Sequence, residues 1–241
     1  MAVLDSSIAN IALPTIAAEL QAPAALSIWV INAYQLAITA LLLPLSALGD
    51  RIGYRRVYLP GLAIFIAGSA ACAMSDSLAT LIAARMFQGI GAAAIMSMNA
   101  ALVRATFPQA KLGRGIGYNA LVLSLSAAAG PSIAALILSA GSWPWLFLIN
   151  IPIGLASLLI GRKALPATEG HGRKPDYPAA VLSAVTLGTL VYGGETLARG
   201  EIGMGAPLLG IALVAGYFLV RREWHREAPL LPLDLLRIPV L

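Results

Sequence analysis

Residues 27–75 read SIWVINAYQLAITALLLPLSALGDRIGYRRVYLPGLAIFIAGSAACAMS, and this stretch decides the fold. Its two apolar runs, 27–48 and 57–75, are separated by a short basic segment. Each run is close to the length of about 20 residues that a helix needs to cross the hydrocarbon of a bilayer. A segment in lipid must satisfy its backbone hydrogen bonds internally, which favours a helix. The stretch therefore predicts two membrane-spanning helices joined by a tight loop.

Composition extends this interpretation to the whole chain. Of its 241 residues, 59% are hydrophobic and 11% are charged, and the mean hydropathy is +0.83. Soluble domains contain roughly 45–50% apolar residues. A soluble fold of this size could not remove so much apolar surface from water, so the composition excludes a soluble protein.

The same length criterion predicts eight spans and an all-α, polytopic transmembrane helical bundle. Breaks with turn residues or charge separate the spans, among them Gly49-Asp50-Arg51. The spans lie at about residues 1–18, 27–48, 57–75, 78–102, 115–139, 145–161, 178–198 and 207–220.

The basic residues predict the orientation, because Lys and Arg near span ends mark the cytoplasmic side. Fourteen of the 16 basic residues fall after even-numbered spans, and Arg199 alone lies in an opposite loop. The fourteen are Arg51, Arg55, Arg56, Arg104, Lys111, Arg114, Arg162, Lys163, Arg173, Lys174, Arg221, Arg222, Arg226 and Arg237. We therefore expect a cytoplasmic N-terminus. Trp29, Trp143 and Trp145 lie near the opposite ends, where aromatic belt residues are expected.

Several function classes are excluded or disfavoured. The net charge of +5 is spread over short clusters rather than one basic face, which argues against nucleic-acid binding. Cys72 is the single cysteine, so the sequence predicts no disulfide and no metal-ligand cluster. We find no nucleophile, metal or nucleotide motif. The chain is therefore not expected to be an enzyme or to need a cofactor.

Two charges are predicted to lie within the hydrocarbon, Asp5 and Arg85. Ionisable groups at such depth usually face a bundle interior or a wet cavity and mark a transport or proton path. A depth difference of roughly 8 Å, from the helical rise, leaves a direct or water-mediated pair open. Two alternatives also stay open: Asp5 near the inner interface, and Arg85 as a structural bridge to helix carbonyls or a neighbouring acid.

Three further features carry two interpretations each. The loop residues Asp50, Arg51, Gly53, Arg55 and Arg56 form either a topogenic turn or a cytoplasmic gate, in which Asp50 caps or electrostatically favours the next helix and Gly53 allows the reversal. Small residues around Gly130-Pro131 indicate close helix packing or a hinge. Five polar side chains within spans form interhelical hydrogen bonds or line a substrate cavity: Asn10, Asn32, Gln35, Gln88 and Asn99.

Five segments, in this order, resemble motifs of the major facilitator superfamily, in its fourteen-span drug:proton antiporter branch. Leu4 to Pro14 resembles the first-span motif LDxTIVNVALP, and Leu48 to Arg56 the loop motif GxLADRxGRK, with Tyr54 in place of its arginine. Arg85 to Gly91 resembles RxxQGxG. Gly130-Pro131 matches the centre of the antiporter motif, and Trp143 to Gly154 resembles WRWxFxINxPIG.

The resemblance implies a domain organisation. Residues 1–161 would form an N-terminal six-span bundle built from paired three-span repeats, 162–177 a cytoplasmic loop, 178–220 two additional linker spans, and 221–241 a cytoplasmic linker toward a second six-span bundle in the same or another chain. It also implies that Asp5 and Arg85 take part in proton and substrate coupling, and that the Asp50 loop is a gate latch.

The function expected from this resemblance is proton-coupled export of small amphiphilic or toxic compounds across the plasma (cell inner) membrane, driven by the proton gradient. The chain would then be a truncated part of the transporter. The alternative is a non-transporting or half-size membrane module that needs a second chain.

Overall fold

The computed structural model describes residues 1–168, 170 and 177–224. Within these residues the chain is helical and contains no strand, as the sequence predicts. The elements are α1 (Ala2–Glu19), α2 (Ala24–Ser27), α3 (Trp29–Ile52), α4 (Tyr54–Ala73), α5 (Leu78–Thr106), the 3-10 turn η1 (Gln109–Lys111), α6 (Leu112–Ala140), α7 (Trp145–Leu148), α8 (Asn150–Ala164), α9 (Tyr177–Ala198) and α10 (Ile202–Glu223).

Seven helical segments are long and apolar enough to cross a membrane. They are Ala24–Ile52, Tyr54–Ala73, Leu78–Thr106, Gln109–Ala140, Trp145–Ala164, Pro178–Ala198 and Ile202–Glu223, and they correspond to predicted spans two to eight. Helix α1 occupies the predicted first span but is not among them, since Asp5, Asn10 and Glu19 lower its hydropathy. The membrane-crossing role of α1 stays a prediction.

Two predicted boundaries are wrong. Helix α3 continues through Gly49-Asp50-Arg51 to Ile52, so these polar residues mark a helix end and the reversal takes place at Gly53 alone. Helix α10 begins at Ile202 rather than near Pro207, because Gly200, with φ +83°, completes the turn after α9. The predicted loop at 162–177 is shorter at its start, because α8 continues to Ala164, and its residues 169 and 171–176 lie outside the described residues. The predicted linker at 221–241 lies mostly outside them.

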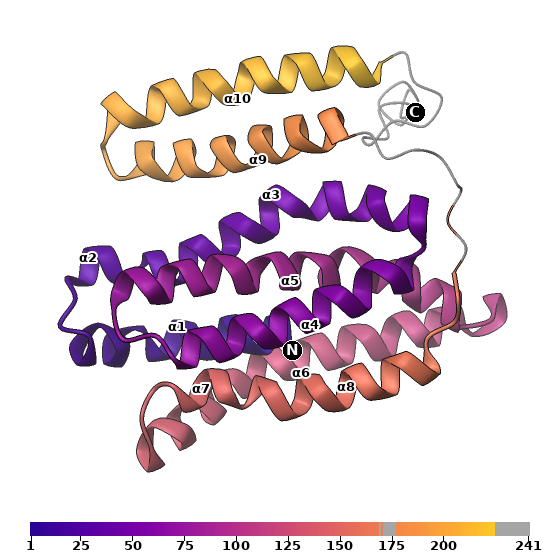
Figure 1. The fold of residues 1–241 in the computed structure, drawn as a ribbon, viewed down its shortest axis with the longest axis horizontal. Helices are drawn as coiled ribbons and strands as arrows, with labels where there is room; N and C mark the ends of the chain where they lie inside the picture. The colour runs from indigo at the N-terminus through magenta and orange to yellow at the C-terminus, as the bar shows by residue number, and fades with distance from the viewer. Residues whose placement is uncertain (169, 171–176, 225–241) are drawn as a thin grey trace.

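Helix α5 is the centre of the arrangement (Figure 1). It packs against α3 on one side and α4 on the other, and α4 in turn packs against α8. The α9–α10 hairpin lies along α3, while α6, α7 and α8 occupy the opposite side of the bundle (Figure 1). Half of the most apolar window of α5 is buried, against 11% of that of α6. Helix α5 is thus a core helix, and α6 presents a long apolar face outward.

Candidate functional site

Asp5 and Arg85 form a direct ion pair inside the bundle. Arg85 Nη1, on α5, lies 2.6 Å from Asp5 Oδ2, on α1, and both side chains are at most 1% exposed. The start of α1 lies near the middle of the bundle in Figure 1, consistent with the depth predicted for Asp5. Asp5 is therefore buried within the bundle, and the pairing that the sequence left open is direct. Its position relative to the inner interface stays a prediction.

The second carboxylate oxygen of Asp5 is also saturated. Asp5 Oδ1 accepts hydrogen bonds from Gln88 Nε2 at 2.9 Å and from Asn150 Nδ2 at 2.6 Å. Gln88 follows Arg85 by three residues, so helical periodicity puts both on one face of α5. Asn150 is the first residue of α8. Three helices thus converge on one carboxylate.

Arg85 makes further contacts that hold it in place. Its Nε donates to the Val30 carbonyl at 3.0 Å, and Nη1 also donates to Gln88 Oε1 at 2.6 Å. The guanidinium carbon lies 4.0 Å from the centre of the Tyr34 ring and 5.6 Å from that of Phe147. A cation over an aromatic face is stabilised by the ring quadrupole, more so where water is excluded. Arg85 therefore makes the contacts expected of a structural bridge, to a carbonyl and to an acid, and its part in coupling stays a prediction.

The network continues into α4. Gln88 Nε2 donates to Ser69 Oγ at 2.8 Å, and Ser69 Oγ donates to the Phe65 carbonyl at 2.9 Å. Among the described residues, Arg85 Nη2 and Asn150 Oδ1 are buried polar atoms without a partner. Buried polar atoms are nearly always hydrogen-bonded in folded proteins. Within the network, these are the two buried polar atoms of the described residues that no protein group satisfies.

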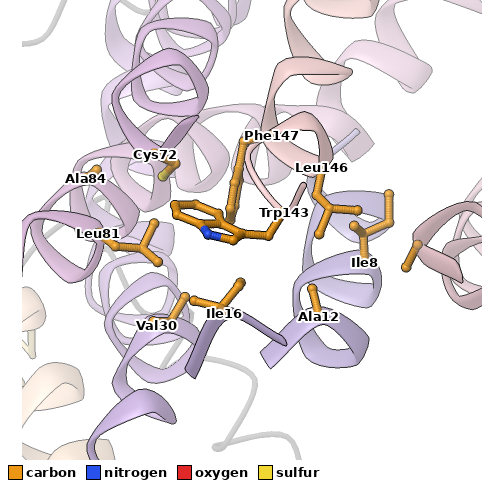
Figure 2. Close-up of a cluster of buried hydrophobic side chains, with 11 residues drawn as sticks. Ile8, Ala12, Ile16, Val30, Cys72, Leu81, Ala84, Trp143, Leu146 and Phe147 are labelled. Atoms are coloured by element: carbon orange, nitrogen blue, oxygen red, sulfur yellow. The ribbon is translucent and has the colours of Figure 1, made fainter. Parts of the chain in front are cut away.

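Buried apolar side chains form a packed cluster, which Figure 2 shows. Trp143 lies at its centre, beside Cys72, Leu81 and Ile16. Phe147 belongs to the cluster and also lies beside the Arg85 guanidinium, so the cluster reaches the charged network directly. Trp143 is 3% exposed, which makes its predicted role as a membrane-belt residue wrong. Close packing of this kind excludes water from one side of the pair.

The loop motif forms a one-residue turn. Gly53 has φ +100° and ψ +138°, a conformation that a residue with a Cβ rarely adopts, and a Cβ there would also overlap the Thr168 carbonyl. The predicted role of Gly53 in the reversal is confirmed. Asp50 lies in the last turn of α3, and its Oδ1 accepts a hydrogen bond at 2.9 Å from Oη of Tyr54, the first residue of α4. Its predicted role in capping or electrostatically favouring α4 stays a prediction.

Two arginines of this loop, Arg55 and Arg56, donate hydrogen bonds to backbone carbonyl groups. Arg55 Nη2 donates to the Arg162 carbonyl at the end of α8, and the Arg55 backbone N–H donates to Thr168 Oγ1 at 3.3 Å. Arg56 Nη1 donates to the Ile52 carbonyl at 3.4 Å. Arg51 lies in the last turn of α3, where its positive charge interacts favourably with the negative end of the helix dipole. These contacts join the α3–α4 turn to the end of α8.

The Gly130-Pro131 segment lies within one continuous helix, α6. Gly130 lies close to α1: a Cβ there would overlap Ser7 Cβ and Oγ, and Ser7 Oγ donates to the Ala127 carbonyl at 3.0 Å. The close-packing interpretation is thus observed. A hinge at Gly130 and Pro131 stays a prediction.

The five polar span residues have different surroundings. Gln88 belongs to the Asp5 network, Asn32 donates to Glu195 Oε1 on α9, and Asn99 donates to Asn119 Oδ1 on α6 at 3.0 Å. Asn10 and Gln35 are exposed on the bundle surface. The interhelical interpretation therefore holds for three of them, and a cavity role for Asn10 and Gln35 stays a prediction.

Sequence reasoning missed three members of the network: Asn150, Ser69 and Tyr34. Asn150 lies inside the Trp143 to Gly154 segment, which was noted as a motif and not as a site. Its signal is an amide at the apolar start of a span, where an unpaired polar group is costly. Tyr34 and Ser69 give no comparable signal, because residues of both types are common in apolar helices.

Comparison with known proteins places this geometry in a family context. The sequence matches the Major Facilitator Superfamily over residues 1–233. It is 51% identical to the uncharacterized transporter YebQ of Escherichia coli K12, over 100% of this chain and 53% of that protein. It is 38% identical to the riboflavin transporter RibZ of Clostridioides difficile 630, over 98% of this chain and 52% of that protein. It is 35% identical to the tetracenomycin C resistance and export protein of Streptomyces glaucescens, over 98% of this chain and 45% of that protein. The chain spans about half the length of these relatives.

Proposed function

The chain belongs to the major facilitator superfamily of membrane transporters, and we propose that it forms the proton-coupling half of an exporter of small amphiphilic or toxic compounds. The observation that carries the proposal is the Asp5–Arg85 ion pair, buried in a bundle of apolar helices and joined by Gln88 and Asn150. A charged pair at such a place is costly to bury and usually marks a transport or proton path.

Protonation of Asp5 is the proposed coupling step. A neutral carboxyl group no longer compensates the Arg85 charge, so the guanidinium is left buried against the Tyr34 ring without a counter-ion. The network must then rearrange or admit another partner, because an uncompensated buried charge costs about 3–5 kcal/mol. That free energy is available to move the helices on which Asp5 and Arg85 lie.

The outward face of α6 supports a second bundle as partner. Leu121, Val122, Leu125 and Leu136 of α6 are between 55% and 70% exposed. Gly130 and Pro131 lie on the same helix, where the close contact with Ser7 links it to α1. A second six-span bundle against this face would put a substrate site between the halves near the midplane, as in other transporters built from repeats.

The substrate class rests on the relatives. One printed name describes resistance and export of tetracenomycin C, and another describes riboflavin transport. A cavity between apolar helices with a few amides would suit small amphiphilic compounds. Asn10 and Gln35, which are exposed in this chain, are the proposed cavity-lining residues. The proposed location is the plasma membrane with a cytoplasmic N-terminus.

The test is transport driven by a pH gradient in inside-out vesicles from cells that express the natural gene, with a panel of amphiphilic substrates. Asp5→Asn is expected to abolish gradient-driven transport while insertion into the membrane persists. The matched control is Asp76→Asn, the same chemical change at an exposed residue between α4 and α5. Undiminished transport by Asp5→Asn, with unchanged pH dependence, would rule out the proton role of Asp5.

A further inference from the structure

A cavity of about 930 Å³ lies between α4 and α8, at the end of the bundle that holds the α3–α4 turn. Arg55 and Arg56 from the start of α4 and Arg162 from the end of α8 line it. The two helices run antiparallel and pack together, so their basic ends coincide (Figure 1). A Cβ on Gly161 would lie 3.3 Å from Leu59 Cδ2, which shows how near the two helices approach here.

The charge of this cavity is uncompensated within residues 1–168, 170 and 177–224. None of the three guanidinium groups forms an ion pair with a carboxylate there. Arg55 and Arg56 each donate one hydrogen bond to a backbone carbonyl. A guanidinium has five N–H donors in a planar fork, which matches a phosphate group. Three such groups around one cavity favour an anion with several oxygen atoms.

Apolar side chains line the same cavity farther from the turn. Leu59 and Ala63 follow Arg55 at intervals of four residues on α4, and Leu158 precedes Arg162 by four residues on α8. Residues four apart lie on one face of a helix, so each helix contributes a stripe that is basic at one end and apolar beyond it. The α4 stripe is about 12 Å long at the rise of an α-helix. A soluble phosphate would contact only its basic end.

Next to Leu158, α8 carries apolar side chains on the bundle surface. Leu155, Leu159 and Ile160 are 47%, 62% and 65% exposed. In a membrane protein, exposed leucine and isoleucine on a spanning helix face lipid rather than water. Lipid acyl chains would therefore lie next to the apolar side of the cavity.

We propose that the cavity between α4 and α8 binds an anionic phospholipid, with its phosphate between Arg55, Arg56 and Arg162 and an acyl chain along Leu59, Ala63 and Leu158. Basic pockets between spanning helices on the cytoplasmic side suit anionic headgroups. Because Arg55 also bonds the end of α8, the bound lipid would fix the α3–α4 turn against α8. This site is separate from the Asp5 network, and its test does not depend on transport.

The experiment measures the binding of dioleoylphosphatidylglycerol and dioleoylphosphatidylcholine to the purified chain by native mass spectrometry. We expect the anionic lipid to be retained at least about tenfold more strongly, since only its headgroup has a net negative charge. Replacing all three arginines with glutamine is expected to weaken its retention by about a hundredfold. The matched control replaces Arg104, Lys111 and Arg114 with glutamine, which removes the same charge outside the cavity, and it should retain the lipid.

Further measurements distinguish binding of a lipid from binding of a soluble phosphate. Glycerol 3-phosphate presents a phosphate on glycerol without acyl chains, and it should compete poorly. Leu59→Gln should weaken retention of the lipid severalfold. If the triple arginine variant loses helicity by circular dichroism, Arg162→Gln alone, at an exposed position, tests the same prediction. Equal retention of both lipids, equal losses in the two triple variants, or competition by glycerol 3-phosphate at lipid concentrations would overturn the proposal.

Discussion

Removing one partner of the Asp5–Arg85 pair is expected to cost much more free energy of unfolding than removing both. Asp5→Asn keeps the size of the side chain but leaves the Arg85 charge, at 0% exposure, without its counter-ion. The new amide NH₂ group also replaces one of the two oxygen acceptors. In one orientation it lies against Arg85 Nη1, and in the other it lies against the donors of Gln88 and Asn150. Breaking a buried pair in this way costs about 3–5 kcal/mol.

Arg85→Gln is expected to cost a similar amount, because the buried carboxylate of Asp5 keeps only the amides of Gln88 and Asn150. If the two sites were independent, the double variant would lose roughly 6–10 kcal/mol. We expect it to lose about 2–4 kcal/mol, because both charges are gone and the remaining loss is the contact of Arg85 with Tyr34 and the Val30 carbonyl.

The assay is the free energy of unfolding in mixed micelles as the fraction of denaturing detergent rises, followed by helix content. Asp76→Asn is the control, since exposed substitutions usually change stability by less than about 0.5 kcal/mol. Transport by the same variants separates folding from coupling: the double variant should recover stability and remain inactive. Additive losses in the double variant would refute the view that the two charges stabilise each other.

Three further predictions follow from the same structure. Native Cys72 is 0% exposed and should not react with a membrane-impermeant maleimide. In a Cys72→Ala background, Ser142→Cys should be labelled in intact cells, and Lys111→Cys should be labelled only after permeabilisation. The reverse labelling pattern would contradict the predicted orientation. Gly53→Ala should lower stability by about 1–2 kcal/mol or more, because φ is +100° there and the new Cβ would overlap the Thr168 carbonyl. Gly117→Ala, within α6 and with open space around it, should be neutral or stabilising. Thermal unfolding of both variants measures the difference. Asn150→Ala should cost about 1.5–3 kcal/mol, because it removes a hydrogen bond to the buried Asp5 carboxylate, and Asn119→Ala, at a half-buried amide pair, should cost less in the same unfolding assay.

The sequence predicts features that depend on local order along the chain. Apolar runs of sufficient length locate the helices α3 to α10, and the lone Gly53 between basic residues locates the turn. The error at Gly49-Asp50-Arg51 shows where this reasoning fails, because polar residues indicate that a segment leaves the membrane and do not indicate that its helix ends. A helix can continue into the headgroup region, as α3 does to Ile52.

Features that depend on which helix faces meet were not predictable in the same way. Depth along a helix placed Asp5 near Arg85, but a direct contact also requires that α1 and α5 turn the correct faces toward each other. Asn150 is 145 positions from Asp5 along the chain, so only packing of α8 reveals it. Trp143 illustrates the same limit, since its position at a span end was correct while its burial among Cys72, Leu81 and Ile16 was not foreseen.

The arrangement of the network gives a physical reason for the proposed role of Asp5 in coupling. In the expected pair of three-span repeats, α1, α3 and α4 form the first and α5, α6 and α8 the second. All three side chains that donate to Asp5 come from the second repeat, and the Arg85 acceptors outside α5, Asp5 and the Val30 carbonyl, come from the first. The apolar contacts around them do not change with protonation. Neutralising Asp5 therefore weakens the charged contacts that join the two repeats, while the packing within each repeat is retained.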